Sequence, residues 1–444
     1  MLVLLAVPIA LQNFVTFCVG LLDNVMIGAL GDAAISGVYM GNQIQTLLQL
    51  VSLGIESAIL VLAAQYWGKR DTESIKKVTS IGLKFSVAIG AVLTVVCAAA
   101  PRWVISLFSS EASVISVGTE YLQILAFSYI FFCITQALIA AMRSVETAKI
   151  GLYVSTASLV VNAVLNYMFI FGKLGAPALG VKGAALATLI ARVIECAIMI
   201  VYVLVIDKKL RFRLRDVLST DKALLRDFIR YGTPLIAGQL VWSVNMLSNS
   251  AIMGRQNVDG VVAALSVTNT LHNLAYVVIN GLGGAVGIIT GKTIGQGEEK
   301  LMREYARTTQ LIFITLGLLT GGMIHLIRDA YISIYNISPA AVGQAKALIN
   351  VISVTLIGGC YQAACLFGLV KSGGDISFVF KNDFIFVFFV VLPSAIIATA
   401  LSAPPWVVFA CLKCDQILKC FVAVVKINRF KWMKNLTRDT VQDP

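Results

Sequence analysis

Apolar residues run through this chain in long blocks that short polar stretches separate. Blocks of about 20 apolar residues are long enough to cross a bilayer as α-helices. The pattern predicts about twelve such helices and therefore an all-α membrane protein. The expected spans lie at about 2–29, 33–66, 80–106, 114–141, 150–171, 180–206, 227–253, 261–293, 305–328, 340–370, 376–401 and 404–427.

Composition agrees with this interpretation. The chain has 444 residues, of which 58% are hydrophobic and 13% are charged, whereas about 25% are charged in an average soluble domain. No basic segment followed by a small-residue cleavage site precedes the first apolar block, so we expect no cleavable signal peptide. Because that block begins at Met1, a short polar leader could precede it in the full protein.

The net charge of +12 raises the question of nucleic-acid binding, and the distribution of the basic residues answers it. Most of the 35 Lys and Arg residues fall in alternate loops and in the C-terminal segment. Such an excess marks the cytoplasmic side of a membrane protein. We therefore expect no nucleic acid as a partner, and both termini in the cytoplasm.

Cysteine and histidine usage predicts no zinc site, and we expect no cofactor other than a coupling ion. The nine cysteines all fall in apolar spans, and the only histidines, His272 and His325, lie far apart in sequence. Cys411 and Cys414 have redox-motif spacing, but they lie in an expected membrane helix. We interpret them as buried small hydrophobic residues.

The two halves of the chain resemble each other. Pro8 and Pro234 are 226 residues apart, as are Gly28 and Gly254. Further pairs follow at 227 or 228 residues: Gly54 with Gly281, Gly68 with Gly295, and Ser144 with Ser372. We conclude that the chain is an internal duplication.

The duplication predicts two parallel lobes of six helices. An even number of helices returns each half to the same side, and such repeats are related by a pseudo-two-fold axis along the membrane normal. We expect an N-terminal lobe at 1–206, a basic cytoplasmic linker at 207–230, a C-terminal lobe at 231–427 and a cytoplasmic tail at 428–444. Two lobes around a cavity are typical of a transporter, in which substrate passes by alternating access.

Asp23 is a carboxylate inside the first apolar block. A central Asp costs roughly 2.5–3.5 kcal/mol on insertion scales, so a compensating role is expected. No Lys or Arg lies within one helical turn of it. Uptake and release of a proton or cation is one interpretation, and a structural pair with a nearby donor is the other.

Asn162 and Asn166 lie four residues apart, on the same side of one expected helix. Their carbonyl oxygens could coordinate a cation, or their amides could join helices by hydrogen bonds. The Asp in the same lobe favours the functional interpretation.

Other polar or aromatic residues in the spans are candidates to line the cavity or to bind substrate. Arg192 and Glu195, three residues apart, are expected to pair with each other. Asp415 and Lys419, four residues apart, are expected to form a structural pair, and Lys381 could neutralise Asp383. The cavity candidates are Glu56, Gln136, Gln239, Trp242, Asn245 and Asp383.

Several stretches together resemble the bacterial multidrug and toxic compound extrusion (MATE) family over nearly the whole chain. They are LLDNVMIGALGDAAISG, AAQYWGKRD, VVNAVLNYMFIFG followed by GVKGAALATLIARVIE, and LKCDQILKCFVAVVKINRFKWMKNLTRD. The resemblance implies a transporter of the bacterial plasma membrane. We expect it to function as a monomer, because the expected cavity lies within one chain. Such a transporter exports organic cations and other amphipathic compounds by antiport with H⁺ or Na⁺.

The resemblance also assigns roles to residues. It matches the family's cation-coupling residues to Asp23, Asn162, Asn166 and Thr188, with Na⁺ as a candidate ion at the first three. Some members have Asp where this chain has Asn166, and some use acids where it has Trp242 and Gly359. The choice between H⁺ and Na⁺ therefore stays open.

Two other functions are weighed against drug export. A flippase for a lipid-linked saccharide, which related two-lobe families perform, requires cationic residues along the cavity. The spans offer few of them. A membrane-embedded enzyme requires clustered acids, a histidine pair or a nucleophile with its base, and the sequence shows no such cluster, so we expect no enzyme.

Overall fold

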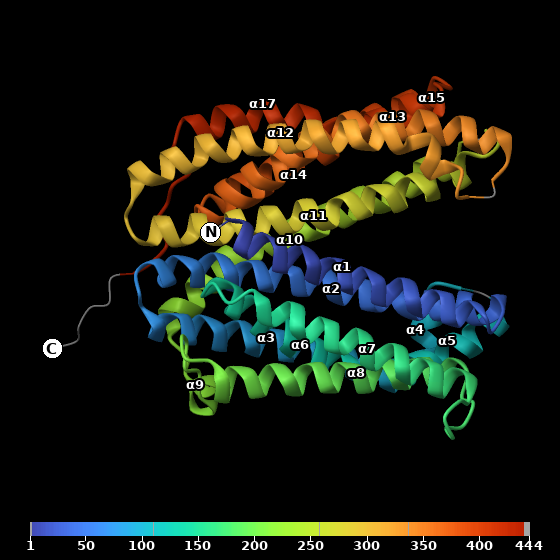
Figure 1. Cartoon of the computed structure of the whole chain (residues 1–444), viewed down its shortest axis with the longest axis horizontal. Helices are drawn as coiled ribbons and strands as arrows, with labels where there is room; N and C mark the ends of the chain where they lie inside the picture. Colours follow the sequence, from blue (N-terminus) through green and yellow to red (C-terminus); the bar gives the residue numbers. More distant parts are fainter. Residues whose placement is uncertain (1, 110, 257, 336, 439–444) are drawn as a thin grey trace. The chain divides into compact units, whose positions relative to one another are not determined.

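The computed structural model describes residues 2–109, 111–256, 258–335 and 337–438. All regular secondary structure in these ranges is helical (Figure 1). Contacts divide the chain into two compact units. We call Leu11–Ile236 the N-terminal unit, and Met1–Ala10 with Ala237–Pro444 the C-terminal unit.

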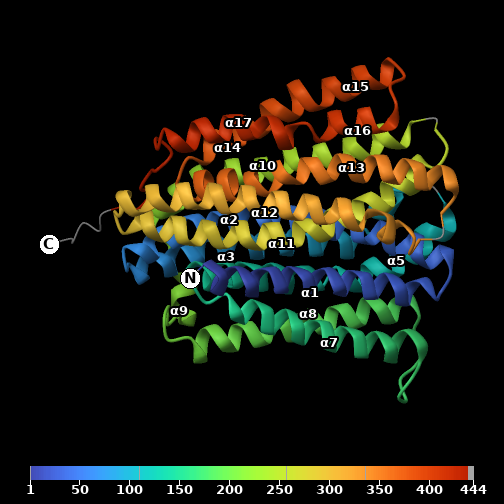
Figure 2. The ribbon, with the colours of Figure 1, turned by 45° about the horizontal axis from the view of Figure 1, so that its top comes forward.

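The N-terminal unit contains the first six expected spans. Its fourth span is a bent pair of helices, α5 and α6, which meet at 52°. The fifth and sixth spans, α7 and α8, pack side by side along their length (Figures 1 and 2). The helices are α1 (Leu2–Gly28) from Leu11 onward, α2 (Asp32–Gly68), α3 (Thr72–Ala99), α4 (Pro101–Ser106), α5 (Ala112–Leu125), α6 (Ser128–Ser144), α7 (Lys149–Phe171), α8 (Val181–Val201), η1 (Tyr202–Ile206), α9 (Leu214–Leu218) and the start of α10 (Lys222–Gly254).

The C-terminal unit contains the last six expected spans, and three of these are interrupted. Two contain π-helical segments, in which the backbone hydrogen bonds shift from i→i+4 to i→i+5. The third breaks at Cys414. The helices are the rest of α10, α11 (Val261–Gly295), α12 (Glu299–Ile332), α13 (Pro339–Gln362), η2 (Ala363–Lys371), α14 (Ile376–Phe386), η3 (Val387–Val391), α15 (Leu392–Ala400), α16 (Pro405–Lys413) and α17 (Asp415–Asn428).

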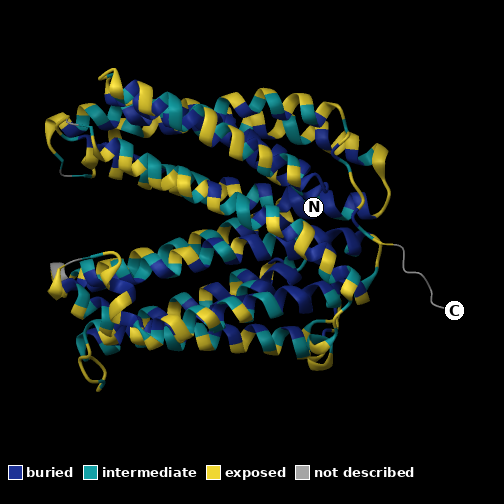
Figure 3. Cartoon of the chain, turned by 180° about the vertical axis from the view of Figure 1, so that it is seen from behind, coloured by how far each residue is buried: buried dark blue, intermediate teal, exposed yellow. Residues whose placement is uncertain are grey.

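The prediction of an all-α, multi-pass membrane protein is confirmed. In the described part, nine helices are long and apolar enough to cross a membrane, and the bent pair α5 and α6 makes a tenth. Exposed residues follow one face of many helices (Figure 3), and they include large apolar side chains such as Leu319 and Phe389. The two other expected spans fail the same test. Polar residues lower the mean hydropathy of α10, and the break at Cys414 leaves α16 and α17 too short to cross a membrane.

The internal repeat is visible in two matching close contacts. A Cβ atom placed on Gly54 would lie 2.6 Å from Cγ1 of Ile236 in the N-terminal unit. A Cβ atom on its repeat partner Gly281 would lie 2.7 Å from Cα of Ala10 in the C-terminal unit. Each glycine therefore admits a neighbouring helix that a larger residue would exclude. Contacts place the unit boundaries within α1 and α10, and the domain boundaries expected at 206, 230 and 427 stay predictions.

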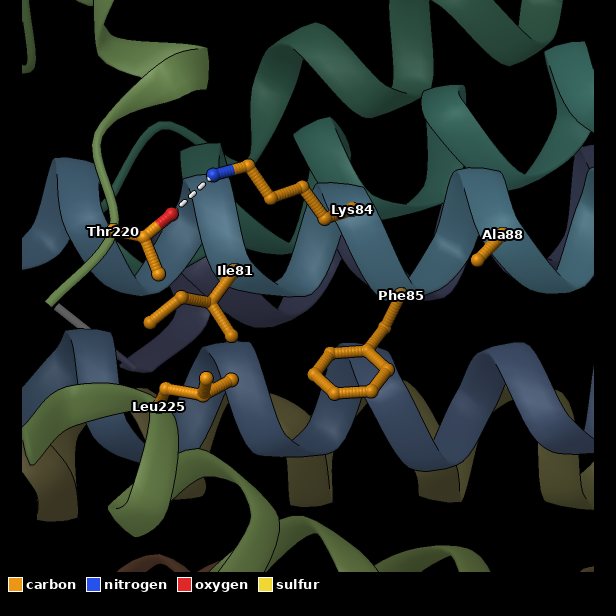
Figure 4. Close-up of a pocket in the computed structure, with 6 residues that line it drawn as sticks. All are labelled: Ile81, Lys84, Phe85, Ala88, Thr220 and Leu225. Carbon is orange, nitrogen blue, oxygen red and sulfur yellow. Dashed lines mark hydrogen bonds between the residues drawn. The ribbon is translucent and has the colours of Figure 1, made fainter. Parts of the chain in front are cut away.

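The basic linker packs against the N-terminal unit. The Lys209 ammonium donates to the carbonyl oxygens of Val145 and Glu146 at 2.7 and 3.2 Å, and Leu210 and Phe212 are buried. Further on, the Lys84 ammonium donates to the Thr220 hydroxyl at the rim of an apolar pocket on α3 (Figure 4). We therefore expect the linker to be an ordered part of this unit.

The segment after α17 packs in a comparable way against the C-terminal unit. We call residues 429–436 the C-terminal strap. Trp432 is fully buried in it, and its indole N–H donates to the Ile427 carbonyl at 3.0 Å. The Lys434 ammonium lies 2.7 Å from the Asp375 carboxylate, which also pairs with Lys426 at 2.5 Å. The turn before α14 thus anchors the strap.

Acidification is expected to loosen the C-terminal strap. Burial opposes ionisation of Asp375, but the ammonium groups of Lys426 and Lys434 outweigh it and lower the pKa of this carboxyl below its usual 3.8. A lowered folded-state pKa adds stability above the unfolded pKa, and the stability is lost as pH falls through the folded value. Cleavage of the strap by an acid-active protease should therefore speed up below about pH 4. The strap of the Asp375→Asn variant should be cleaved fast at every pH. Equally slow cleavage of the variant and the wild type above pH 4 would contradict the expectation.

Candidate functional site

Four predicted residues come together in the N-terminal unit. α1 supplies Asp23, α7 supplies Asn162 and Asn166, and α8 supplies Thr188. The two asparagines project from one face of α7, because they are four residues apart. α7 ends at Phe171, Gly172 caps it, and a short loop returns the chain into α8, so the threonine lies beside the first asparagine.

A chain of hydrogen bonds links these four side chains. The Asn162 amide donates to the Thr188 hydroxyl at 3.4 Å. The Asn166 amide donates to Oδ1 of Asn162 at 3.1 Å, and also to the Asp23 carboxylate. Both asparagines are 1% exposed. This series of hydrogen bonds runs from the Thr188 hydroxyl to the Asp23 carboxylate, which accepts from the Asn166 amide.

One buried oxygen in this arrangement has no partner. Oδ1 of Asn166 accepts no hydrogen bond in the described part of the chain. A buried carbonyl without a partner costs about 1–3 kcal/mol. A cation or a hydrogen-bond donor that contacts this amide oxygen would relieve the cost. The site offers a carboxylate, two amide oxygens and a hydroxyl, which are the ligands that hard cations prefer.

The site opens into a cavity of about 170 Å³ inside the N-terminal unit. Its wall is rich in polar side chains from α1, α2, α5, α7 and α8. The Tyr121 hydroxyl donates to Oδ1 of Asn42 at 3.2 Å, which joins α5 to α2. The lining residues are Thr16, Val19, Gly20, Asp23, Asn24, Asn42, Gln45, Thr46, Gln49, Tyr121, Ser158, Asn162, Thr188, Ala191 and Arg192.

Arg192 is the basic residue of this wall, and its charge is already compensated. Its guanidinium donates to the Glu195 carboxylate at 2.6 Å, so the predicted pairing three residues apart is present. Ser158 donates to the same carboxylate at 3.3 Å, and Arg192 lies 5.0 Å from the centre of the Phe132 ring. Among the described residues no Lys or Arg lies within 4.0 Å of Asp23, and Arg192 acts on this carboxylate from farther away.

The structure places the other predicted residues elsewhere. Glu56 on α2 interacts electrostatically with Arg143 on α6 and does not line the cavity, nor does Gln136 on α6. Asp383 on α14 pairs with Lys419 on α17 at 2.9 Å, which corrects the expectation that Lys381 neutralises it. The remaining candidates lie on α10 in the C-terminal unit: Gln239, Trp242 and Asn245.

The sequence analysis missed the contribution of α2 to the cavity. Asn42, Gln45, Thr46 and Gln49 stand at positions i, i+3, i+4 and i+7. This is the spacing of one helical face, and all four line the cavity. A polar stripe at helical spacing within an apolar span was the signal that could have identified this wall. Tyr121 gave no such signal, because aromatic residues are common in membrane helices.

Asn166→Asp is expected to strengthen Na⁺ binding. The substitution places a second carboxylate against Asp23, and two adjacent carboxylates need a proton or a cation between them. A Na⁺ concentration tenfold above the Kd stabilises a folded protein by about 1.4 kcal/mol. Thermal unfolding in detergent should shift upward in NaCl relative to choline chloride for the variant, and less for the wild type. Equal shifts in both proteins would contradict the cation-binding role of this pair.

Comparisons with known proteins agree on one family. The family model described as MatE matches residues 8–168 and 234–397. The chain is 23% identical to the "Probable multidrug resistance protein NorM" of Thermotoga maritima, over 80% of this chain and 75% of that protein. It is 28% identical to the "Probable multidrug resistance protein YoeA" of Bacillus subtilis, over 72% of this chain and 69% of that protein.

Solved structures share the fold. One is described as the outward-facing conformation of a multidrug resistance MATE family transporter of the MOP superfamily. It aligns with a TM-score of 0.85 at 20% identity, over 97% of this chain and 96% of that chain. A second, of MATE in complex with MaL6, aligns with a TM-score of 0.87 at 19% identity, over the same shares. At this identity the likeness shows the fold alone.

Proposed function

The chain belongs to the MatE family, and on that premise we propose that it exports organic cations and other amphipathic compounds in exchange for H⁺ or Na⁺. Export proceeds by alternating access, and the coupling ion binds at Asp23 with Asn162, Asn166 and Thr188. The names of the relatives support drug export. The excess of Lys and Arg in alternate loops supports a plasma-membrane protein with cytoplasmic termini.

One observation carries the proposal. Asp23 lies in the wall of a polar cavity with no described Lys or Arg within 4.0 Å, next to amide oxygens that include an unsatisfied one. A carboxylate in a membrane helix costs free energy unless a proton, a cation or a base neutralises it. A group that is neutralised by a mobile ion can load from one side of the membrane and unload at the other.

The concentration gradient of the coupling ion supplies the driving force for such an exchange. When one H⁺ or Na⁺ enters for each monovalent organic cation that leaves, no net charge crosses the membrane, and the membrane potential does no work. A tenfold ion gradient is worth about 1.4 kcal/mol and supports a concentration ratio of about ten for the exported cation.

Transport by purified protein in vesicles tests the proposal. A fluorescent organic cation such as ethidium is loaded, and a pH gradient or a Na⁺ gradient is imposed separately. We expect one gradient to drive the cation against its concentration difference, and that gradient identifies the ion. Movement that needs neither gradient would contradict antiport.

A lipid flippase is the second candidate, and two lysines of the C-terminal unit favour it. Lys371 on η2 and Lys413 on α16 are partly buried, and among the described residues no carboxylate lies within 4.0 Å of either ammonium. Such lysines suit an anionic headgroup. Transfer of a fluorescent anionic lipid between leaflets, without transport of the organic cation, would favour this function over drug export.

A further inference from the structure

An apolar pocket of about 240 Å³ lies at the linker end of the N-terminal unit. It shares no lining residue with the cavity at Asp23. We call it the α3 pocket, because α3 supplies most of its wall and the linker and α10 supply the rest (Figure 4). Its lining residues are Ile81, Lys84, Phe85, Ala88, Thr220 and Leu225.

The two sides of the α3 pocket are fixed to each other by side-chain contacts. The Ser80 hydroxyl and the Lys84 ammonium both donate to the Ser219 carbonyl oxygen, at 3.0 and 3.3 Å. The Phe85 ring stacks on the Phe228 ring of α10, with 5.7 Å between the ring centres and 8° between the planes. These contacts hold the linker and the start of α10 against α3, so the pocket is a formed part of the fold.

Lys84 brings a positive charge to the rim of this pocket. Its ammonium donates to backbone carbonyl oxygens of the linker turn and to the Thr220 hydroxyl. These partners carry no net charge, and no carboxylate of the described residues lies within 4.0 Å of the ammonium. Asp221, the acid that follows Thr220, pairs with Lys77 at 3.6 Å instead. The rim can therefore attract an anion.

More positive charge surrounds this rim. The linker at 207–230 contains eight basic and four acidic residues. Lys222 lies three residues before Leu225 and on the same side of α10. Its side chain is exposed, and in the described part no carboxylate lies within 4.0 Å of its ammonium. A basic group of this kind beside a membrane helix attracts the headgroups of anionic lipids.

The apolar surface of the pocket continues along α3, away from the linker. Ile81, Phe85, Ala88, Val92 and Val95 recur at every third or fourth position, so they lie on one face of the helix. Val92 and Val95 are 61% and 65% exposed. α3 is also one of the helices that are long and apolar enough to cross a membrane. This face therefore offers a path along which a hydrocarbon chain can leave the pocket and enter the bilayer.

Apolar side chains of the linker independently support a contact with lipid. α9 carries Leu214 and Leu218, which are 71% and 82% exposed and lie four residues apart. Arg213 and Arg215 flank Leu214, and both are exposed. Apolar side chains among basic ones suit the boundary between the headgroups and the acyl chains of a membrane. This end of the unit is therefore suited to the membrane surface.

Volume and charge argue against the organic cation of the proposed function as the occupant. Pockets that enclose a drug-sized ligand have volumes of about 300–1,000 Å³, and the α3 pocket is smaller. The Lys84 ammonium also repels a cation. The pocket is suited instead to one part of a longer anionic molecule, whose remainder lies along α3.

We propose that the α3 pocket binds one anionic phospholipid of the cytoplasmic leaflet. The cytoplasmic side is the one that the topology of the proposed function assigns to the linker. The phosphate group lies against Lys84 and Lys222, and one acyl chain enters the pocket between Phe85 and Leu225 and continues past Val92. The lipid thereby joins α3 to the linker, which connects the sixth and seventh spans.

Photolabelling in vesicles tests the site without any transport. The full chain is placed in phosphatidylcholine vesicles that contain a trace of phosphatidylglycerol with a photoreactive acyl chain, and mass spectrometry of peptides locates the adducts. We expect adducts within 81–95 of α3, whereas a phosphatidylcholine probe with the same chain should label this segment weakly. Lys222→Gln should lower labelling by the anionic probe about fivefold, the usual share of one basic residue near a charged membrane surface.

Further variants separate lipid binding from folding. Lys84→Gln should also lower the labelling, and Lys84→Arg should retain it. Lys222→Gln guards against misfolding, because this side chain makes no hydrogen bond or ion pair in the described part, whereas Lys84 holds the linker turn. Lys173→Gln is the matched control. It removes an exposed lysine from the loop between α7 and α8, at the opposite end of the unit (Figure 1), and should leave labelling unchanged.

Equal labelling of 81–95 by the anionic and the neutral probe would overturn the proposal, as would undiminished labelling in both Lys84→Gln and Lys222→Gln. Competition identifies the ligand, because unlabelled phosphatidylglycerol should displace the probe, and a fatty acid or free glycerol phosphate at the same concentration should not. Displacement by either of these would overturn the assignment to a phospholipid. The labelling does not depend on ion exchange at Asp23, so failure of the proposed function would leave these results unchanged.

Discussion

Replacing Asp23 with Asn is expected to abolish the uphill export of an organic cation in a pH or Na⁺ gradient. The amide has nearly the shape of the carboxylate, but it cannot bind a proton or compensate a cation. A loss of about 1.4 kcal/mol in ion binding already weakens the affinity tenfold, and removing the charge of the site should cost at least this much. Initial rates of ethidium export from vesicles measure the effect.

Two further variants show whether the effect belongs to this carboxylate. Asp23→Glu keeps the charge and should retain part of the coupled transport. Glu120→Gln removes an exposed acid of the same unit, one that lies 3.8 Å from Lys182, and should leave transport unchanged. Uphill export that persists in Asp23→Asn would remove this residue from the coupling role, and would direct attention to Glu56 and Asp383.

Replacing Trp432 with Ala is expected to destabilise the protein by about 3–5 kcal/mol, the usual cost of truncating a buried aromatic residue. Its ring fills the space above Gly373, where a Cβ atom would lie only 2.3 Å from Cε3 of the ring. The change also removes the hydrogen bond to Ile427. Unfolding in detergent, followed by heat or denaturant, measures the loss.

Trp406 provides the matched control. It is 49% exposed at the start of α16, so Trp406→Ala should change stability far less. A chain that ends after α17 should lose at least as much stability as Trp432→Ala, because it loses the whole C-terminal strap. Equal stability of the two Trp variants would contradict the idea that the strap is part of the folded C-terminal unit.

Much of the fold could be predicted from the sequence because membrane helices need long apolar blocks. The repeat was equally visible, and the pair Gly54 and Gly281 has a physical basis in matching close contacts. Asn162 and Asn166 could be placed on one face because helical spacing is fixed. Their hydrogen bonds to Thr188 and Asp23 depend on how α1, α7 and α8 pack. The resemblance to the MATE family anticipated that these four residues form one site, whereas spacing alone did not.

The rest depends on contacts between residues that are distant in sequence. The partner of Asp383 is Lys419 on another helix, 36 residues away, and not the nearby Lys381. The burial of Trp432 could not be predicted in a segment expected to be a cytoplasmic tail, because one aromatic residue among lysines carries no periodic signal. The bend between α5 and α6 and the break at Cys414 likewise lack a Gly or Pro at the interruption.

The central claim is that the organic cation and the coupling ion exchange at the Asp23 site, and ion release on substrate binding tests it most directly. Purified protein in weakly buffered detergent solution receives ethidium, while a pH indicator follows protons and a radioactive tracer follows bound Na⁺. The account predicts release of one of these ions from the wild type and none from Asp23→Asn. Binding of ethidium to the wild type without release of either ion would contradict it.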